Sequence, residues 1–175
     1  MTAKPVIELP ARSRWHALRL MWAAIGDDID RVYADAKIDG VSRNYVKELI
    51  RLHVRGPMTV SELATSVKRS QFTTNRKVAD MEAVGLVKTT ASADDRDKAD
   101  DRDKIVAVTA KTEQIVDRLM AEWEATEATI AEVEAEIPYP ISQAAADLEK
   151  ALERKSFHER IIDKLSENAN WSTPN

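Results

Sequence analysis

One stretch of the chain decides its fold. Residues 56–109 read GPMTVSELATSVKRSQFTTNRKVADMEAVGLVKTTASADDRDKADDRDKIVAVT. The capping-box pattern Thr59-Val60-Ser61-Glu62 predicts a helix over 60–68. Ser70 is a natural N-cap for a second helix over 71–84, which Gly85 ends. The inward positions of the two helices are Leu63, Ala64, Val67, Thr74, Val78 and Met81.

Two strands are expected after those helices. Leu86–Thr90 and Ile105–Val108 are short β-branched runs on either side of a charged loop. In that loop DDRDKA at 94–99 is followed at once by DDRDKI at 100–105. A helix-turn-helix followed by a β-hairpin is the outline of a winged-helix DNA reader. A DNA-facing wing with six acidic residues, however, requires an explanation.

The composition is that of a soluble globular protein with one core. The 175 residues are 43% hydrophobic and 32% charged, and the 4 Gly and 6 Pro favour helices, so we expect a mainly α (α+β) fold. No apolar run approaches the ~18 residues that span a bilayer, and the N-terminus lacks the apolar stretch of a signal peptide. The absence of cysteine excludes disulfides and thiolate metal sites. We therefore expect a cytoplasmic protein without a membrane segment.

The charge is distributed unevenly. The net charge of −4 argues at first against DNA binding, but residues 43–92 carry 9 basic and 4 acidic groups, a net +5. Residues 93–104 carry 4 basic and 6 acidic groups, and residues 111–175 carry 7 and 14. A positive segment on an acidic body still suits contacts with phosphates.

Amphipathic helices are expected on both sides of the central stretch. One covers 11–36, ends at Asp39-Gly40, and is followed by a helix over 43–55 that Ser42 caps. A long helix begins at Thr109 and continues to about 137, where Pro138-Tyr139-Pro140 breaks it, and a last helix covers 141–167. The seam of the first helix is Trp15, Leu18, Trp22, Ile25, Ile29 and Val32, and the stripe of the long helix is Ile115, Leu119, Trp123, Ile130, Val133 and Ile137. The last helix adds Leu148, Leu152, Ile161, Ile162 and Leu165. This is more apolar surface than one small core can cover, so we expect a dimer.

The whole order closely resembles the MarR family of bacterial transcriptional regulators. The residues that carry the resemblance are TVSELATSV at 59–67, SQFTTNRKVADMEAVGLV at 70–87, the DDRD wing, and IVAVTAKTEQIV at 105–116. The resemblance implies a single MarR-like domain over 1–175, with a winged-helix DNA-binding lobe at 43–108 and dimerisation helices at 11–36 and 110–167. It also implies a homodimeric repressor whose 70–84 helix enters the major groove of double-stranded DNA. A small aromatic or phenolic effector that releases the DNA is typical of the family.

The candidate DNA contacts lie in the turn, on the second helix and in the wing. Asn75 suits adenine, and Arg76 suits guanine or a phosphate, whereas Phe72 either meets a thymine methyl or folds back on the turn. Lys68 and Arg69 suit phosphates, helped by the N–H groups at the start of the helix. Thr59 and Ser61 could also reach phosphate, although capping alone explains Thr59. The full set is Lys68, Arg69, Ser70, Gln71, Phe72, Thr73, Asn75, Arg76, Arg96 and Arg102.

The duplicated wing departs from the single DxRDxR-like stretch of the family. Its arginines, Arg96 and Arg102, are the candidates for insertion into the minor groove. Asp95 would brace the first, or Asp101 the second, as an aspartate braces the arginine in the family's wing. We favour Arg102, which lies nearer the second strand; the alternative is a mobile loop in which one copy has no role.

The resemblance also implies an effector site on the first two expected helices, where the family's ligand cleft forms. Its candidates, Trp15, His16, Arg19, Trp22, Tyr45 and His53, combine aromatic walls with a cation for a carboxylate. Trp15 and Trp22 also fall on the seam, where an interface role is favoured. The three histidines form no HxxxH pair, so no metal site, cofactor or enzyme activity is expected. Two alternatives stay open: a ligand-independent accessory regulator, and a winged helix used as a protein-interaction module.

Overall fold

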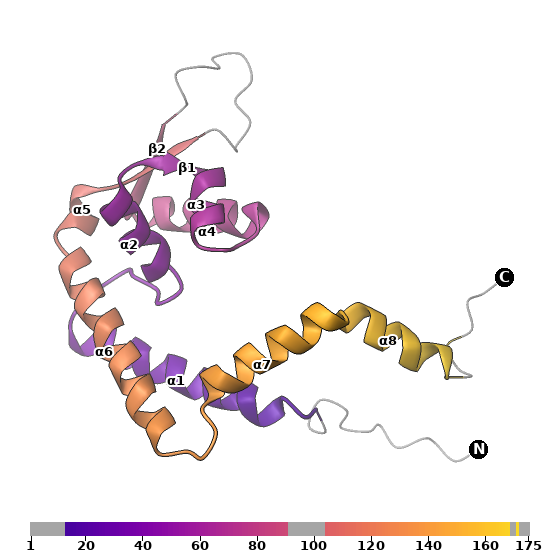
Figure 1. The fold of residues 1–175 in the computed structure, drawn as a ribbon. Helices are drawn as coiled ribbons and strands as arrows, with labels where there is room; N and C mark the ends of the chain where they lie inside the picture. The colour runs from indigo at the N-terminus through magenta and orange to yellow at the C-terminus, as the bar shows by residue number, and fades with distance from the viewer. Residues whose placement is uncertain (1–12, 91–103, 169–170, 172–175) are drawn as a thin grey trace, which may run out of the picture. The chain divides into compact units, whose positions relative to one another are not determined.

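The computed structural model describes residues 13–90, 104–168 and 171. The chain divides into two compact units, Met1–Ala121 and Glu122–Asn175. The first unit holds, in chain order, α1 (His16–Asp35), α2 (Val46–Arg55), β1 (Met58–Thr59), α3 (Val60–Ser66), α4 (Gln71–Ala83), β2 (Val87–Thr90), β3 (Ile105–Val108) and α5 (Ala110–Glu113) (Figure 1). It also holds the start of α6 (Val116–Ala135), which continues into the second unit.

Capping residues fix the helix-turn-helix as the sequence predicts. The Thr59 hydroxyl accepts a hydrogen bond from the Glu62 amide (3.2 Å), and the Glu62 carboxylate accepts one from the Thr59 amide (2.8 Å), which completes the capping box of α3. The Ser70 hydroxyl accepts a hydrogen bond from the Thr73 amide at the start of α4. Gly85, with φ of +73°, follows the end of α4, where glycine adopts a left-handed conformation without strain.

The wing strands belong to a small antiparallel sheet with the strand order β1-β3-β2. Val87 lies opposite Val108, and Thr90 opposite Ile105, so β2 and β3 pair along their whole length. The sequence prediction missed β1, in which Met58 pairs with Val106 and Thr59 with Ile105. A two-residue strand has no period that a sequence pattern could display. The fold is therefore mainly helical, as expected, and its wing sheet has three strands where two were expected.

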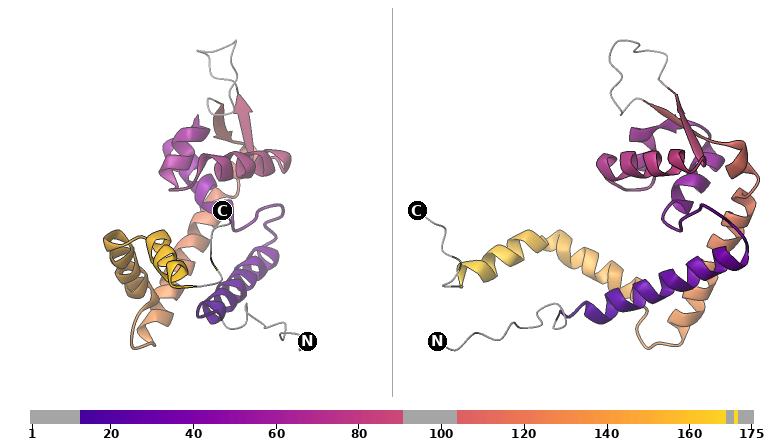
Figure 2. Two further views of the ribbon diagram at one scale, coloured as in Figure 1. Left: turned by 90° about the vertical axis from the view of Figure 1, so that its right-hand side faces the viewer. Right: turned by 180° about the vertical axis from the view of Figure 1, so that it is seen from behind.

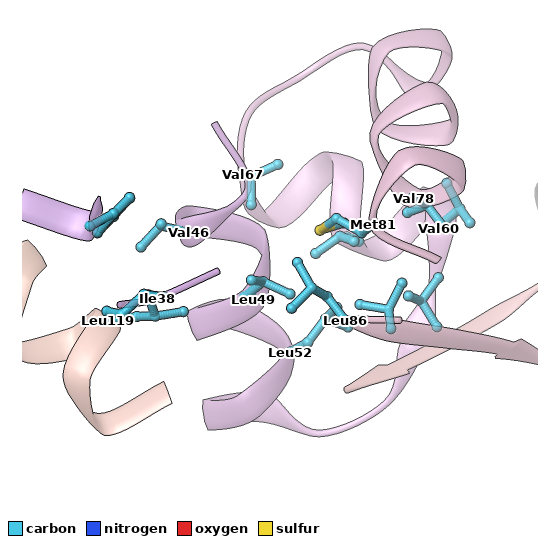
Figure 3. Close-up of a cluster of buried hydrophobic side chains, with 14 residues drawn as sticks. Ile38, Val46, Leu49, Leu52, Val60, Val67, Val78, Met81, Leu86 and Leu119 are labelled. Carbon is cyan, nitrogen blue, oxygen red and sulfur yellow. The ribbon is translucent and has the colours of Figure 1, made fainter. Parts of the chain in front are cut away.

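One hydrophobic core lies beneath the helix-turn-helix. Its buried side chains come from α1, the segment after α1, α2, α3, α4, the β2 and β3 strands and the first turn of α6, and Figure 3 shows ten of them labelled. The inward positions predicted for α3 and α4 are all buried. The remaining large core members lie on α2, before β2 and on α6: Leu49, Leu52, Leu86 and Leu119. This core holds α4 against the rest of the lobe and so determines which face of α4 stays outside.

The first two helices begin or end at residues other than those predicted. Ser42 does not cap α2, which begins at Val46 with Tyr45 as its N-cap; instead the Ser42 hydroxyl accepts a hydrogen bond from the Asn44 amide within a turn. The end of α1 at Asp35 precedes Asp39-Gly40, because Lys37 has a left-handed backbone with φ of +53°. Residues 11–12, where the first helix was expected to begin, lie outside the described residues.

The predicted long helix from Thr109 is two helices. The short α5 ends at Glu113, and α6 begins only at Val116. The Thr112 hydroxyl is buried and donates to the carbonyl of Leu86 (2.6 Å), which holds α5 at the base of the wing. Because α5 is anchored there, the chain changes direction before α6 begins.

The second unit is a series of helices. After α6, the Pro138-Tyr139-Pro140 break precedes α7 (Ile141–Arg154), as predicted. The prediction of one continuous last helix over 141–167 is wrong. The segment forms two helices, because α7 ends at Arg154 and α8 (Phe157–Ser166) follows. Ser156 and Glu159 form a second capping box at that break. Among the described residues, no helix is both long and apolar enough to cross a membrane.

Candidate nucleic-acid interface

The outer face of α4 carries the predicted reading residues. Thr74, Val78 and Met81 are buried, so the opposite face of the helix is directed to solvent. Phe72 is 81% exposed, Thr73 and Arg76 are exposed, and Asn75 is half-buried. Figure 2 shows α3 and α4 in the same lobe as the wing strands from two sides. Phe72 does not fold back on the turn, because a side chain that did so could not stay so exposed.

The turn between α3 and α4 brings two basic residues to the start of α4. The amides of Lys68 and Arg69 donate to the carbonyls of Thr65 and Ala64, and these bonds close the C-terminus of α3. Lys68 is exposed and has φ of +54°, a left-handed conformation that is strained for a residue with a side chain. The turn is thus tightly held, and it presents the Lys68 side chain to solvent beside the N-terminus of α4.

Arg69 has a partner that the sequence did not indicate. Its Nε lies 3.1 Å from Oε1 of Glu48, on α2, in an ion pair, and Nζ of Lys77 lies 3.0 Å from the same oxygen. Glu48 is completely buried. A charged residue on an amphipathic helix is normally assigned to the solvent face, so Glu48 was not predicted here. The available signal was its spacing from the inward Leu52, four residues on, which places both on one face of α2.

Gln71 is less accessible than its neighbours on α4. The residue is half-buried, and its Nε2 is buried without a hydrogen-bond partner among the described residues. Ser70 uses its hydroxyl on the Thr73 amide and the Thr73 hydroxyl. Of the predicted contacts on this helix, Phe72, Thr73 and Arg76 therefore have the most open side chains.

Hydrogen bonds tie the base of the wing to the reading helix. The Glu82 carboxylate, near the end of α4, accepts from the amide (2.9 Å) and the hydroxyl (2.7 Å) of Thr89 on β2. These bonds fix the direction in which β2 leaves the core. Arg96 and Arg102, with their proposed braces Asp95 and Asp101, lie outside the described residues.

The predicted effector residues are distributed over α1, α2 and the residues just before these helices. Trp15 and Trp22 are about half exposed on α1, and Arg19 donates to the Ser13 hydroxyl (3.2 Å). Nδ1 of His53, on α2, lies at hydrogen-bonding distance (2.8 Å) from the Glu113 carboxylate of α5. His16 and Tyr45 are half-buried.

An open hollow of about 520 Å³ lies elsewhere, at the C-terminus of α2 and on α3, lined by Arg55, Pro57, Met58, Ser61, Glu62, Thr65 and Ser66. No sequence pattern pointed to it. Separately, no group of three or more possible metal ligands occurs among the residues that the structure describes.

Comparisons with known proteins agree with this geometry. Residues 41–96 match the model of the MarR family. Solved structures of the same fold include the Staphylococcus aureus MepR–DNA complex, with 18% identity, a TM-score of 0.59, and coverage of 81% of this chain and 97% of that chain. The Mycobacterium tuberculosis transcriptional regulator MosR in complex with DNA has 23% identity, a TM-score of 0.56, and coverage of 82% and 98%.

A MarR family transcriptional regulator from Silicibacter pomeroyi has 19% identity, a TM-score of 0.53, and coverage of 82% and 97%. A comparison with curated protein sequences gives no match. The likeness to these structures extends over almost their full length and concerns the fold. Residues 41–96 are therefore similar to the MarR family, and the solved structures of MarR-type regulators share the fold of this chain.

Proposed function

We propose that the protein binds a pseudo-palindromic DNA site as a homodimer and represses transcription by blocking polymerase. The half-sites would lie about one helical turn apart, ~10 base pairs, as two-fold symmetry requires. In this proposal α4 enters the major groove and the wing touches the neighbouring minor groove. Arg102 is the wing arginine that we favour for the minor groove.

One observation carries the proposal: the outer face of α4 offers reading side chains beside a basic turn. Phe72, Thr73 and Arg76 are exposed on that face, and Lys68 and Arg69 precede it. Arg76 has no ion pair within the described part of the chain, so its guanidinium is available to a guanine or a phosphate. The MepR and MosR structures that share the fold are DNA complexes, which supports the same use of this surface here.

A gel-shift series on the DNA upstream of the protein's own gene tests the proposal. Phosphate contacts release counterions, so the affinity should fall steeply as salt rises, with a slope of about −0.9 for each neutralised phosphate. Arg76→Ala should weaken binding and reduce sequence preference. Absence of binding by the wild-type protein at low salt would overturn the proposal, and weak binding with little salt dependence would favour a protein-interaction module.

The apolar surfaces of both units support the homodimer. In the first unit, α1 exposes Trp15, Leu18, Leu20, Trp22 and Val32, and the second unit exposes Trp123, Val133, Ile137, Tyr139, Leu148, Phe157, Ile161, Ile162 and Trp171. Large apolar side chains in such number normally mark an interface. Light scattering coupled to size-exclusion chromatography should give twice the 19.6 kDa mass of one chain. A monomer at micromolar concentration would contradict this part of the proposal.

A small aromatic or phenolic acid is the effector that we propose. The aromatic surface of Trp15 and Trp22 and the cation Arg19 on α1 are the support for it. A ligand that binds the folded state raises the melting temperature, so a thermal-shift screen of aromatic acids tests this directly. If no compound shifts the melting temperature, the ligand-independent alternative is favoured.

A further inference from the structure

A buried carboxylate connects three parts of the DNA-binding lobe. Oε1 of Glu48, on α2, forms an ion pair with Nε of Arg69 in the turn (3.1 Å) and accepts a hydrogen bond from Nζ of Lys77 in the middle of α4 (3.0 Å). The Glu48 side chain has no exposed surface, and its Oε2 has no partner among the described residues. One oxygen atom therefore contacts two cations, one in the turn before α4 and one in the middle of α4.

Packing alone does not explain such a group. A charge buried away from water is costly, and a buried ion pair is often no more stabilising than apolar side chains of the same volume. Glu48 is as deeply buried as its apolar neighbours Leu49 and Leu52. The carboxylate therefore has to be explained by what it does to its two partners.

The two partners are held in different ways. Lys77 is almost enclosed, with a side chain 13% exposed, and it also donates to the carbonyl of Asn44. Arg69 has a side chain 40% exposed and uses only Nε on Glu48. The guanidinium group carries five N–H donors in a rigid plane, so the remaining four, on the η nitrogens, stay available on the side away from the carboxylate.

Arg69 lies where a DNA phosphate would meet the start of α4. It immediately precedes Ser70, the N-cap of α4, where unpaired backbone N–H groups and the helix dipole favour an anion. Exposed Lys68 lies next to it in the same turn. A phosphate at this end of the reading helix would fix the register of α4 in the groove.

We propose that Glu48 is a positioning residue that holds Arg69 through Nε, so that its η nitrogens clamp one DNA phosphate at the start of α4. Lys77 balances the buried charge and does not reach the DNA. The inference rests on the DNA binding proposed above and adds a specific atom-level role to two residues. It also predicts that the shape of the Arg69 side chain matters as much as its charge.

The alternative is that Glu48 only neutralises the two cations. The two explanations predict opposite changes in DNA affinity for Glu48→Gln. If Glu48 positions Arg69, Glu48→Gln should weaken DNA binding. If it merely neutralises, the same substitution should strengthen binding and steepen the salt dependence, because it removes one negative charge beside the two cations.

Fluorescence anisotropy with an operator duplex over a salt series is the test. We expect Arg69→Lys to lose about tenfold in affinity with an unchanged salt slope, because a lysine keeps the charge but cannot serve the carboxylate and a phosphate together. Arg69→Ala should bind at least as weakly and lower the slope by about 0.9 per protomer. In the Glu48→Gln protein, the further loss caused by Arg69→Lys should be much smaller than in the wild type.

Two matched controls complete the design. Asp80→Asn removes an exposed carboxylate from α4 itself, and Arg31→Lys alters an arginine paired with Asp28 on α1 (2.9 Å). Both should bind like the wild type within about twofold. Failure of the wild-type protein to bind would overturn the proposed function, whereas wild-type binding that Arg69→Lys leaves intact would overturn the positioning role alone. Since Arg69 is half exposed, that variant remains decisive even if Glu48→Gln fails to fold.

Discussion

Gly26→Ala should lower the free energy of unfolding when residue 43 is arginine and raise it when residue 43 is alanine. Gly26 lies buried in the middle of α1, and the guanidinium of Arg43 donates to its carbonyl (3.1 Å) and pairs with Asp30. A Cβ at position 26 would lie 2.5 Å from Nη2 of Arg43 and 2.6 Å from its Cζ. Gly26→Ala therefore displaces the guanidinium and breaks both interactions, which join α1 to the segment before α2.

The gain in helix propensity and the loss of the Arg43 interactions are of similar size and opposite in sign. Alanine in a helix interior is favoured over glycine by about 1 kcal/mol. The lost hydrogen bond to the Gly26 carbonyl costs about 1–1.5 kcal/mol, and the ion pair adds a few tenths, since its partners are 34% and 50% exposed and screened by solvent. The displaced guanidinium is the mobile end of a long side chain, so steric strain adds little. The net loss should be about 0.3–0.8 kcal/mol.

Urea denaturation of four proteins at one concentration measures the effect: the wild type, Gly26→Ala, Arg43→Ala and the double variant. In the wild-type background Gly26→Ala should lower the free energy of unfolding. In the Arg43→Ala background it should raise it by about 1 kcal/mol, because only the helix propensity of alanine remains. An effect of the same sign in both backgrounds would refute the assignment of Arg43 to the Gly26 carbonyl.

Three further outcomes can be measured. Lys68→Gly should raise the free energy of unfolding by up to about 1 kcal/mol by relieving the left-handed backbone, while DNA binding weakens and the salt slope falls by about 0.9 per protomer in anisotropy. Phe72→Ala, at an 81% exposed position, should leave stability within about 0.5 kcal/mol in urea but weaken binding to operators with a thymine at the contacted step. Hydrogen bonds from the backbone and then the side chain of Thr59 lower the pKa of Glu62 below 4.5. This carboxylate therefore stabilises the fold above that pH and loses its contribution as the pH falls through the lowered pKa, so the stability difference between wild type and Glu62→Gln should shrink on acidification.

Local signals account for what the sequence predicted correctly. The start of α3 is set by Thr59 and Glu62, and the start of α4 by Ser70. Each of these capping hydrogen bonds joins residues three positions apart in the chain. The inward faces of both helices follow from the 3.6-residue period. Each of these features depends on the chain only over one or two helical turns, which is the range that a sequence pattern can describe.

Long-range contacts account for what the sequence missed. The break between α5 and α6 depends on Thr112, whose hydroxyl donates to Leu86 some twenty-six residues earlier. The two-residue β1 exists because its partner β3 lies nearby in the sheet. The break before α8 is different: Ser156 and Glu159 have the same capping-box spacing as Thr59 and Glu62, so it was predictable but hidden by an uninterrupted apolar period.

The charge of the reading head is the case where local reasoning and structure differ most. Residues 43–92 carry a net charge of +5, yet Arg69 and Lys77 both form an ion pair with Glu48 inside the lobe. The family resemblance implied an aspartate–arginine brace in the wing, Asp95 with Arg96 or Asp101 with Arg102, and these residues lie outside the described part of the chain. In the described structure the braced arginine lies in the helix-turn-helix, and its carboxylate comes from twenty-one positions earlier in the chain. A net charge therefore bounds how many phosphates this head can neutralise, whereas the pairing of each cation decides which of them are free to do so.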